Sequence, residues 1–196
     1  MNLANKLTIM RIILIPLFLV FILVKDIPYG SLIALLIFVL ASITDKVDGY
    51  IARSRNQITN FGKFMDPLAD KMLVISALIA LVECGLIPSW MVIVIIAREF
   101  AISGLRMLAA SEGLIVAASW WGKIKTVIQI AATMALLLRL NYDQIGFVKE
   151  FFESNGVLIG FINYVPMTLM VLSVIATVVS GIDYFIKNRK VINYKK

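Results

Sequence analysis

The 196-residue sequence contains no histidine, and its only cysteine is Cys84. A Ser-His-Asp triad, a histidine-based zinc site and an iron–sulfur cluster are therefore excluded. A single cysteine also excludes a disulfide within the chain. Any chemistry that this protein performs must use carboxylates, lysines, arginines, hydroxyl groups and recruited metal ions.

Charged residues are scarce as well. They make up 16% of the chain, and 61% of its residues are hydrophobic, whereas soluble domains average about 25% and about 45–50%. A chain of this length has too little interior to bury so much apolar side chain in one soluble core. We therefore expect an all-α integral membrane protein whose helices each have about the ~20 residues needed to cross a bilayer. The six predicted transmembrane helices lie at about residues 9–24, 31–50, 66–82, 88–108, 124–140 and 157–186.

Lysine and arginine are distributed unevenly between the two sides that these six helices define. If the N-terminus is cytoplasmic, fifteen of the nineteen basic residues fall on the inner side, three fall on the outer side, and Arg98 falls within a span. This positive-inside bias predicts that both termini are cytoplasmic. The basic residues of the C-terminal tail are explained by contact with anionic lipid headgroups, so we expect no binding of nucleic acid.

The N-terminal apolar run has the basic start of a signal peptide, but no small-residue cleavage site follows it. We therefore expect an uncleaved anchor, preceded by a short N-terminal interfacial helix at residues 2–8. The chain has no internal repeat and no long linker, so residues 1–196 are expected to form a single transmembrane domain. Residues 141–155 are polar and are expected to form an outer loop.

Four of the twelve acidic residues fall within one short window, at the cytoplasmic ends of the second and third spans. Asp45 and Asp48 are three residues apart, and Asp66 and Asp70 are four apart. Both spacings place the two acids of a pair on one helix face. A solvated position near a helix end is an ordinary explanation for any one of these acids. Four acids on two adjacent antiparallel helices instead predict a functional pocket at the inner membrane boundary.

Four carboxylates in a partly desolvated pocket require protons or cations between them. Ligands that are all oxygen select hard ions such as Mg²⁺, Mn²⁺ or Ca²⁺. Two such ions about 3.5–4 Å apart form the clamp used for displacement at phosphorus. Small and basic residues beside the acids suit phosphate binding. They are Lys46, Gly49, Arg53, Arg55, Gly62 and Lys63.

Together these residues resemble the signature of the CDP-alcohol phosphatidyltransferase family. All eight specified positions are present in the pattern Asp45-x₂-Asp48-Gly49-x₂-Ala52-Arg53-x₈-Gly62-x₃-Asp66-x₃-Asp70. Three further segments are similar to the phosphatidylglycerophosphate synthase branch of that family. They are Asn5-x-Leu7-Thr8-x₂-Arg11, Arg98-Glu99-Phe100-x₂-Ser103-x-Leu105-Arg106 and Gly122-Lys123-x-Lys125-Thr126-x₂-Gln129.

The resemblance implies transfer of the phosphatidyl group from CDP-diacylglycerol to sn-glycerol 3-phosphate, with release of CMP, by a homodimer in a bacterial plasma membrane. It implies two divalent cations, Mg²⁺ or Mn²⁺, held by the four acids, with Asp70 also acting as general base. The implied metal ligands are Asp45, Asp48, Asp66 and Asp70. The residues implied to line the CDP site are Gly49, Ala52, Arg53 and Gly62.

The phosphate of the acceptor requires a cationic pocket of its own. We expect it among polar residues of the branch-specific segments, although the positive-inside rule also explains basic residues there. Arg98 is the exception, because a mid-span arginine needs a partner such as Glu99. The candidates are Thr8, Arg11, Arg98, Arg106, Lys123 and Lys125.

The sequence leaves two kinds of alternative open. Within the same family the acceptor is inositol phosphate, serine or phosphatidylglycerol instead of glycerol 3-phosphate. In a different class, the acids form the ion site of a cation transporter. The glycine–arginine pattern beside the acids argues against transport, because Arg53 would repel the transported ion.

Overall fold

A computed structural model describes residues 3–54, 60–111 and 119–188 of the chain. Within the helices, the side chains of residues 3–7, 45–54, 60–67 and 70 lie outside the described part. Every regular element in the described ranges is an α-helix, which confirms the all-α class. The elements are α1 (Leu3–Leu23), α2 (Gly30–Ser54), α3 (Asn60–Glu83), α4 (Ser89–Ser111), α5 (Trp120–Gln144), α6 (Gly146–Glu153) and α7 (Gly156–Lys187).

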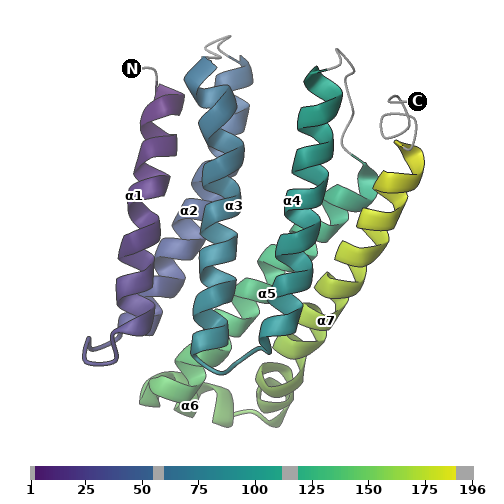
Figure 1. Ribbon diagram of the computed structural model, residues 1–196. Helices are drawn as coiled ribbons and strands as arrows, with labels where there is room; N and C mark the ends of the chain where they lie inside the picture. Colours follow the sequence, from purple (N-terminus) through teal and green to yellow (C-terminus); the bar gives the residue numbers. More distant parts are fainter. Residues whose placement is uncertain (1–2, 55–59, 112–118, 189–196) are drawn as a thin grey trace.

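The long helices α1 to α5 and α7 coincide with the six apolar segments of the sequence, and they alternate in direction along the bundle (Figure 1). The start of α1, the end of α2, the start of α3 and the end of α7 therefore lie at one end, here called the terminal end. The opposite end carries α6. By length and composition, α5 and α7 are each apolar enough to cross a membrane. Even α1, with 21 residues, is about 31 Å long at 1.5 Å per residue, which matches a bilayer core.

The separate interfacial helix expected at residues 2–8 is not formed in the structure. The first helix instead runs unbroken from Leu3 to Leu23. No glycine or proline interrupts its first three turns, so nothing in the sequence ends a helix there. Thr8 and Arg11 are 1% and 2% exposed, and this burial holds the N-terminal half of α1 against its neighbours.

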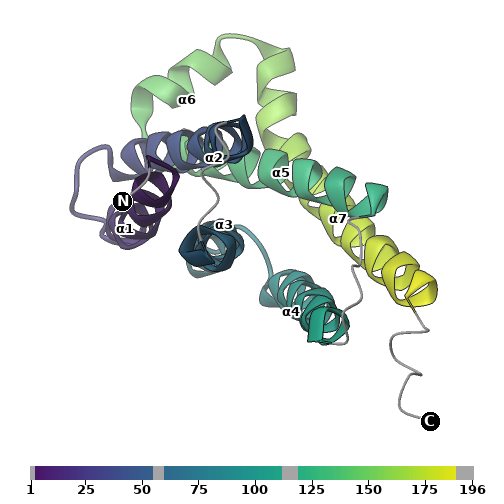
Figure 2. The same cartoon turned by 90° about the horizontal axis from the view of Figure 1, so that it is seen from above.

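The outer loop expected at residues 141–155 is also wrong in part, because α5 continues to Gln144 and α6 follows directly. The short helix is amphipathic. Val148 and Phe152 are buried, whereas Phe147 and Phe151 are 58% and 64% exposed. The apolar residues at positions 147, 148, 151 and 152 share one broad side of the helix, which explains why it forms despite its polar neighbours. It projects to the side of α2 and α5 that faces away from α4 (Figure 2).

The main core lies where α1, α2, α3 and α5 meet. Phe18 of α1 and Phe38 of α2 are fully buried, with ring centroids 6.2 Å apart. At the opposite end, the buried Asn141 amide of α5 donates to the backbone carbonyl of Ser31 on α2 at 3.1 Å, and Ser31 donates its hydroxyl to Asn141 at 3.2 Å. These contacts hold the end of α5 beside the start of α2.

Helix α4 adds Met91, Val92 and Ile95 of its first two turns to this core and otherwise packs against α3 and α7 (Figure 2). Across the described parts of α4 and α5, no pair of Cα atoms comes within 8 Å. The space between these two helices is consequently open to side chains from four helices. The candidate site described below occupies that space.

Candidate functional site

The four predicted metal ligands lie on two helices at the terminal end of the bundle (Figure 1). Asp45 and Asp48 are in the last turns of α2, and Asp66 and Asp70 are in the first turns of α3. The two helices are consecutive and pack against each other, as the sequence predicts. The side chains of these acids lie outside the described part, so their convergence stays a prediction. The same holds for the predicted CDP-binding residues Gly49, Ala52, Arg53 and Gly62.

A second feature, which the structure describes fully, is a cavity of about 600 Å³ between α3, α4, α5 and α7. Its polar wall consists of four basic side chains, one acid and several hydroxyl groups. Its apolar wall comes mainly from α5. The polar lining residues are Lys71, Arg98, Glu99, Ser103, Arg106, Ser119, Lys123, Thr126 and Tyr184.

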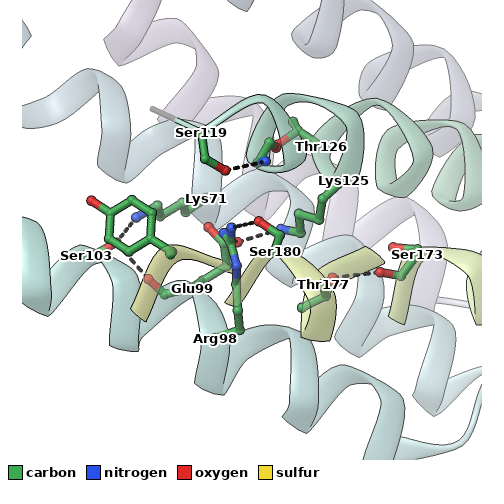
Figure 3. A network of polar contacts seen from close by, with 12 residues as sticks. Lys71, Arg98, Glu99, Ser103, Ser119, Lys125, Thr126, Ser173, Thr177 and Ser180 are labelled. Atoms are coloured by element: carbon green, nitrogen blue, oxygen red, sulfur yellow. Dashed lines mark hydrogen bonds and ion pairs between the residues drawn. The ribbon is translucent and has the colours of Figure 1, made fainter. Parts of the chain in front are cut away.

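Glu99 joins one of these four cations, Arg98, to Lys125 of α5, which is not among the lining residues (Figure 3). Its Oε1 atom accepts hydrogen bonds from Arg98 Nη1 at 2.8 Å and from Lys125 Nζ at 2.5 Å. The other terminal nitrogen of Arg98 donates to Ser180 Oγ on α7 at 2.5 Å. All three charged side chains are largely buried, with exposures of 13% for Arg98, 15% for Glu99 and 4% for Lys125. The ion pair is therefore formed in a region of low dielectric, where each charge depends on its partner.

The remaining three cations of the cavity contact neutral groups. Lys71 donates to the hydroxyl of Ser103. Arg106 Nε donates to the Tyr184 hydroxyl at 3.1 Å. The ammonium of Lys123 lies 5.1 Å from the centre of the Trp120 ring. The partners described for these three cations carry no negative charge, so the side chains keep their capacity to bind an anion.

The local sequence explains how α5 places its lysines at this site and how α7 leaves space for Arg98. Ser119 caps α5, because its hydroxyl accepts the backbone N–H of Gly122 at 3.1 Å. This cap starts the helix so that Lys123 and Lys125 fall in its first two turns. On α7, a side chain at Gly181 would place its Cβ 3.3 Å from Arg98 Cγ, so the glycine leaves room for the arginine stem.

The predicted acceptor residues separate into two groups. Arg98, Arg106 and Lys123 line the cavity together, whereas Lys125 is not a lining residue and contacts the lining residue Glu99. Thr8 and Arg11 are buried on α1 and are not among the residues that line it.

Sequence reasoning missed Lys71. The charge pattern placed this residue on the inner side as one basic residue among many. Its position directly after Asp70 on the acid-bearing helix is the signal that indicates a role in the site.

No group of three potential metal ligands occurs among the residues whose side chains are described. The side chains of the four predicted aspartates lie outside that part, and the basic lining of the cavity suits an anion. Helix α3 contributes to both features, since it carries Asp66 and Asp70 as well as Lys71.

Comparison with known proteins gives a consistent result. Residues 1–179 match the sequence profile of the CDP-alcohol phosphatidyltransferase family. The chain is 47% identical over 199 positions to the CDP-diacylglycerol–glycerol-3-phosphate 3-phosphatidyltransferase of Bacillus subtilis (strain 168), an alignment that covers 95% of each protein. Proteins with the same name from Haemophilus influenzae and Rickettsia bellii are 43% and 36% identical to it. Those alignments cover 71% and 94% of this chain, and 77% and 93% of the relatives.

Proposed function

The chain belongs to the CDP-alcohol phosphatidyltransferase family, and on that basis we propose that it transfers the phosphatidyl group of CDP-diacylglycerol to sn-glycerol 3-phosphate. The products are phosphatidylglycerophosphate and CMP, so the protein is a transferase of phospholipid biosynthesis. Relatives named for this reaction align with nearly the whole chain, which supports the assignment. The observation that carries the choice of acceptor is the cationic cavity beside α3.

The membrane arrangement that fits this function has six transmembrane helices in a single domain, with both termini in the bacterial cytoplasm. Apolar side chains on the outside of the bundle support it, among them Ile13, Ile93 and Leu108, each 63% exposed. The exposed Trp120 and Trp121 at the start of α5 suit the inner membrane boundary. We place the protein in the bacterial plasma membrane as a homodimer. Its mass in detergent, after subtraction of bound detergent, tests the dimer.

The family uses divalent metal ions, and the four aspartates of α2 and α3 are the residues that would hold them. The donor set fits two Mg²⁺ or Mn²⁺ ions, because hard cations prefer carboxylate oxygens and this chain offers no histidine ligand. Metal ions bound there would neutralise the diphosphate and make CMP a better leaving group.

The residues of the chain perform the rest of the reaction. Gly49, Ala52, Arg53 and Gly62 bind the CDP portion of the donor. Asp70 accepts the proton of the acceptor hydroxyl, whose oxygen then attacks the phosphorus that is bonded to diacylglycerol. The bond from this phosphorus to the oxygen of CMP breaks, and CMP leaves with the electron pair.

The cavity supports an acceptor that carries a phosphate group. A phosphate monoester carries about −1.5 to −2 charges at neutral pH, and Lys71, Arg106 and Lys123 offer cationic groups with neutral partners. Serine has no net charge and gives no reason for three such cations. An inositol phosphate has the same anionic group, so the choice between the two phosphates depends on the assay.

The test supplies purified protein with labelled CDP-diacylglycerol, Mn²⁺ and one acceptor at a time, and identifies the lipid product. Glycerol 3-phosphate should give phosphatidylglycerophosphate, and serine should give none. Formation of a product with serine or inositol phosphate but not with glycerol 3-phosphate would overturn the proposal. Thermal protection by CMP with Mn²⁺ separates a transferase from a cation transporter, which has no site for cytidine.

A further inference from the structure

Glu99 is the only acidic side chain that lines the cavity in the part of the chain with described side chains. One of its oxygen atoms contacts cations of two helices, Arg98 on α4 and Lys125 on α5. The cavity requires positive charge to bind an anion, yet this carboxylate cancels part of it. Because the Glu99 carboxylate weakens the attraction of the cavity for an anion, its role in the site must be a different one.

The position of the contact indicates what that contribution is. Helices α4 and α5 have no close backbone approach in their described ranges, and the Glu99–Lys125 ion pair spans the space between them. Arg98 extends the connection to Ser180 on α7 (Figure 3). One carboxylate thus links three helices at the wall of the cavity, and α4 itself carries Arg106.

Burial makes this link strong. Lys125 is 4% exposed and Glu99 is 15% exposed. If one of the two side chains is removed, hydration by water therefore compensates for little of the lost interaction. Loss of the carboxylate would leave two cations close together without the counterion that they share. Two buried cations that lose a shared counterion move apart or draw in water, because removal of one partner of a buried pair is strongly destabilising.

We propose that Glu99 is a positioning residue for the acceptor: its carboxylate fixes Arg98 and Lys125, and through them the spacing of α4 and α5, so that the cavity fits the phosphate group. Glu99 does not touch the acceptor. The inference rests on the proposed function, since it concerns the binding of the phosphate-bearing acceptor in that reaction.

The sign of the effect distinguishes positioning from simple electrostatics. Replacing Glu99 by glutamine adds one net positive charge to the cavity, which by itself favours an anion and lowers the KM for glycerol 3-phosphate. Loss of positioning predicts the reverse. For Glu99→Gln we expect the KM for glycerol 3-phosphate to rise about tenfold or more, while the KM for CDP-diacylglycerol and kcat stay within about threefold.

Three further variants define the role of the charge. Glu99→Asp keeps the carboxylate and should recover part of the acceptor affinity. Glu99→Gln combined with Lys125→Met should raise the KM no more than the worse single change, because the two residues act as one unit. Asp143→Asn is the matched control, since this acid also pairs with an arginine, Arg139 at 3.3 Å, but at the opposite end of the bundle.

Thermal unfolding of the detergent-solubilised protein gives a second measurement that does not depend on turnover. Glycerol 3-phosphate should protect the wild-type protein and the Asp143→Asn variant but not Glu99→Gln. CMP with Mn²⁺ should protect all three, which shows that the variant is folded.

An unchanged or lower KM for glycerol 3-phosphate in Glu99→Gln would overturn the positioning role, and so would an equal rise in the KM for both substrates. If the wild-type protein makes no product from glycerol 3-phosphate, the proposed function fails instead.

Discussion

Lys71 on α3 donates a hydrogen bond to the hydroxyl of Ser103 on α4, and this contact joins the acid-bearing helix to the helix that carries Arg98 and Arg106. Ser103 in turn donates to the backbone carbonyl of Glu99 at 2.7 Å. The lysine directly follows Asp70, whose Cα is about 3.8 Å from its own. The predicted base and a candidate ligand of the acceptor phosphate are therefore neighbours on one helix.

Replacement of Lys71 by methionine should weaken acceptor binding. Methionine has a similar length but removes the charge, and a hydrogen bond to a charged group contributes about 1.5–3 kcal/mol, or about 10- to 150-fold in affinity. We expect the KM for glycerol 3-phosphate to rise by about this factor and the KM for CDP-diacylglycerol to change little. Steady-state kinetics with each substrate varied in turn measure both values.

Lys149→Met at the opposite end of the bundle is the control for loss of a lysine, because Lys149 is exposed on α6 and pairs only weakly, at 3.8 Å, with Glu153. Activity of that variant should equal the wild-type activity. A wild-type KM for glycerol 3-phosphate in Lys71→Met would remove this lysine from the site.

The helices of this chain follow closely from its sequence, but the cationic cavity does not. Long apolar windows predict the six long helices because backbone polar groups in a membrane must be satisfied within each helix. The Glu99–Lys125 pair joins residues 26 positions apart on helices that do not pack closely, and no local pattern indicates such a contact. The positive-inside rule already accounts for a lysine at position 71, so charge distribution alone does not indicate that Lys71 lines the cavity.

The two errors in local structure have a related cause. Whether residues 3–8 lie on a membrane surface or continue a helix is decided by the burial of Thr8 and Arg11, which depends on neighbouring helices. The polar content of residues 141–155 favours a loop, whereas residues 146–153 of that segment form a helix. Their apolar residues follow a helical period over only two turns, and such a short stretch gives a weak signal.

Gly181→Ala should impair acceptor binding through Arg98. The added methyl group would lie 3.3 Å from Arg98 Cγ, so the arginine must shift by a few tenths of an ångström from its contacts with Glu99 and Ser180. We expect the KM for glycerol 3-phosphate to rise about two- to fivefold.

Gly160→Ala is the matched control, since it is on the same helix and no described atom lies within 4 Å of its added methyl group. Both changes raise helix propensity by about 0.5–1 kcal/mol, so the comparison isolates the steric effect. Equal kinetics in the two variants would contradict the role of Gly181.

The single cysteine offers a test of the membrane orientation. Cys84 follows α3 at the opposite end of the bundle, whereas Ser111 ends α4 at the terminal end. In intact cells, a membrane-impermeant maleimide should label Cys84. It should label the Cys84→Ser/Ser111→Cys variant only after the membrane is permeabilised. The reverse pattern would place the termini outside.

The rate of this labelling should also depend on pH. Burial, and next the charge of Glu83, raise the pKa of the Cys84 thiol above its ordinary value. Only the thiolate reacts, so labelling is slow at neutral pH and should quicken about tenfold per pH unit as long as the pH stays below the pKa. A rate that levels off at about pH 8.5, the ordinary pKa of a cysteine thiol, would show that the pKa is not raised.

Asp66→Asn should abolish turnover without preventing insertion into the membrane. Asparagine keeps the size of the side chain but removes a negative charge from the predicted ligand set, so divalent cations are held more weakly and the charge on the diphosphate is less well neutralised. We expect kcat to fall about 100- to 1,000-fold and thermal protection by CMP with Mn²⁺ to be lost. Asp143→Asn, which removes an acid at the opposite end, should retain both. Substantial activity of Asp66→Asn together with Mn²⁺-dependent protection would show that the aspartates of α2 and α3 are not the metal centre. The cationic cavity would then have to be explained without a metal centre beside it.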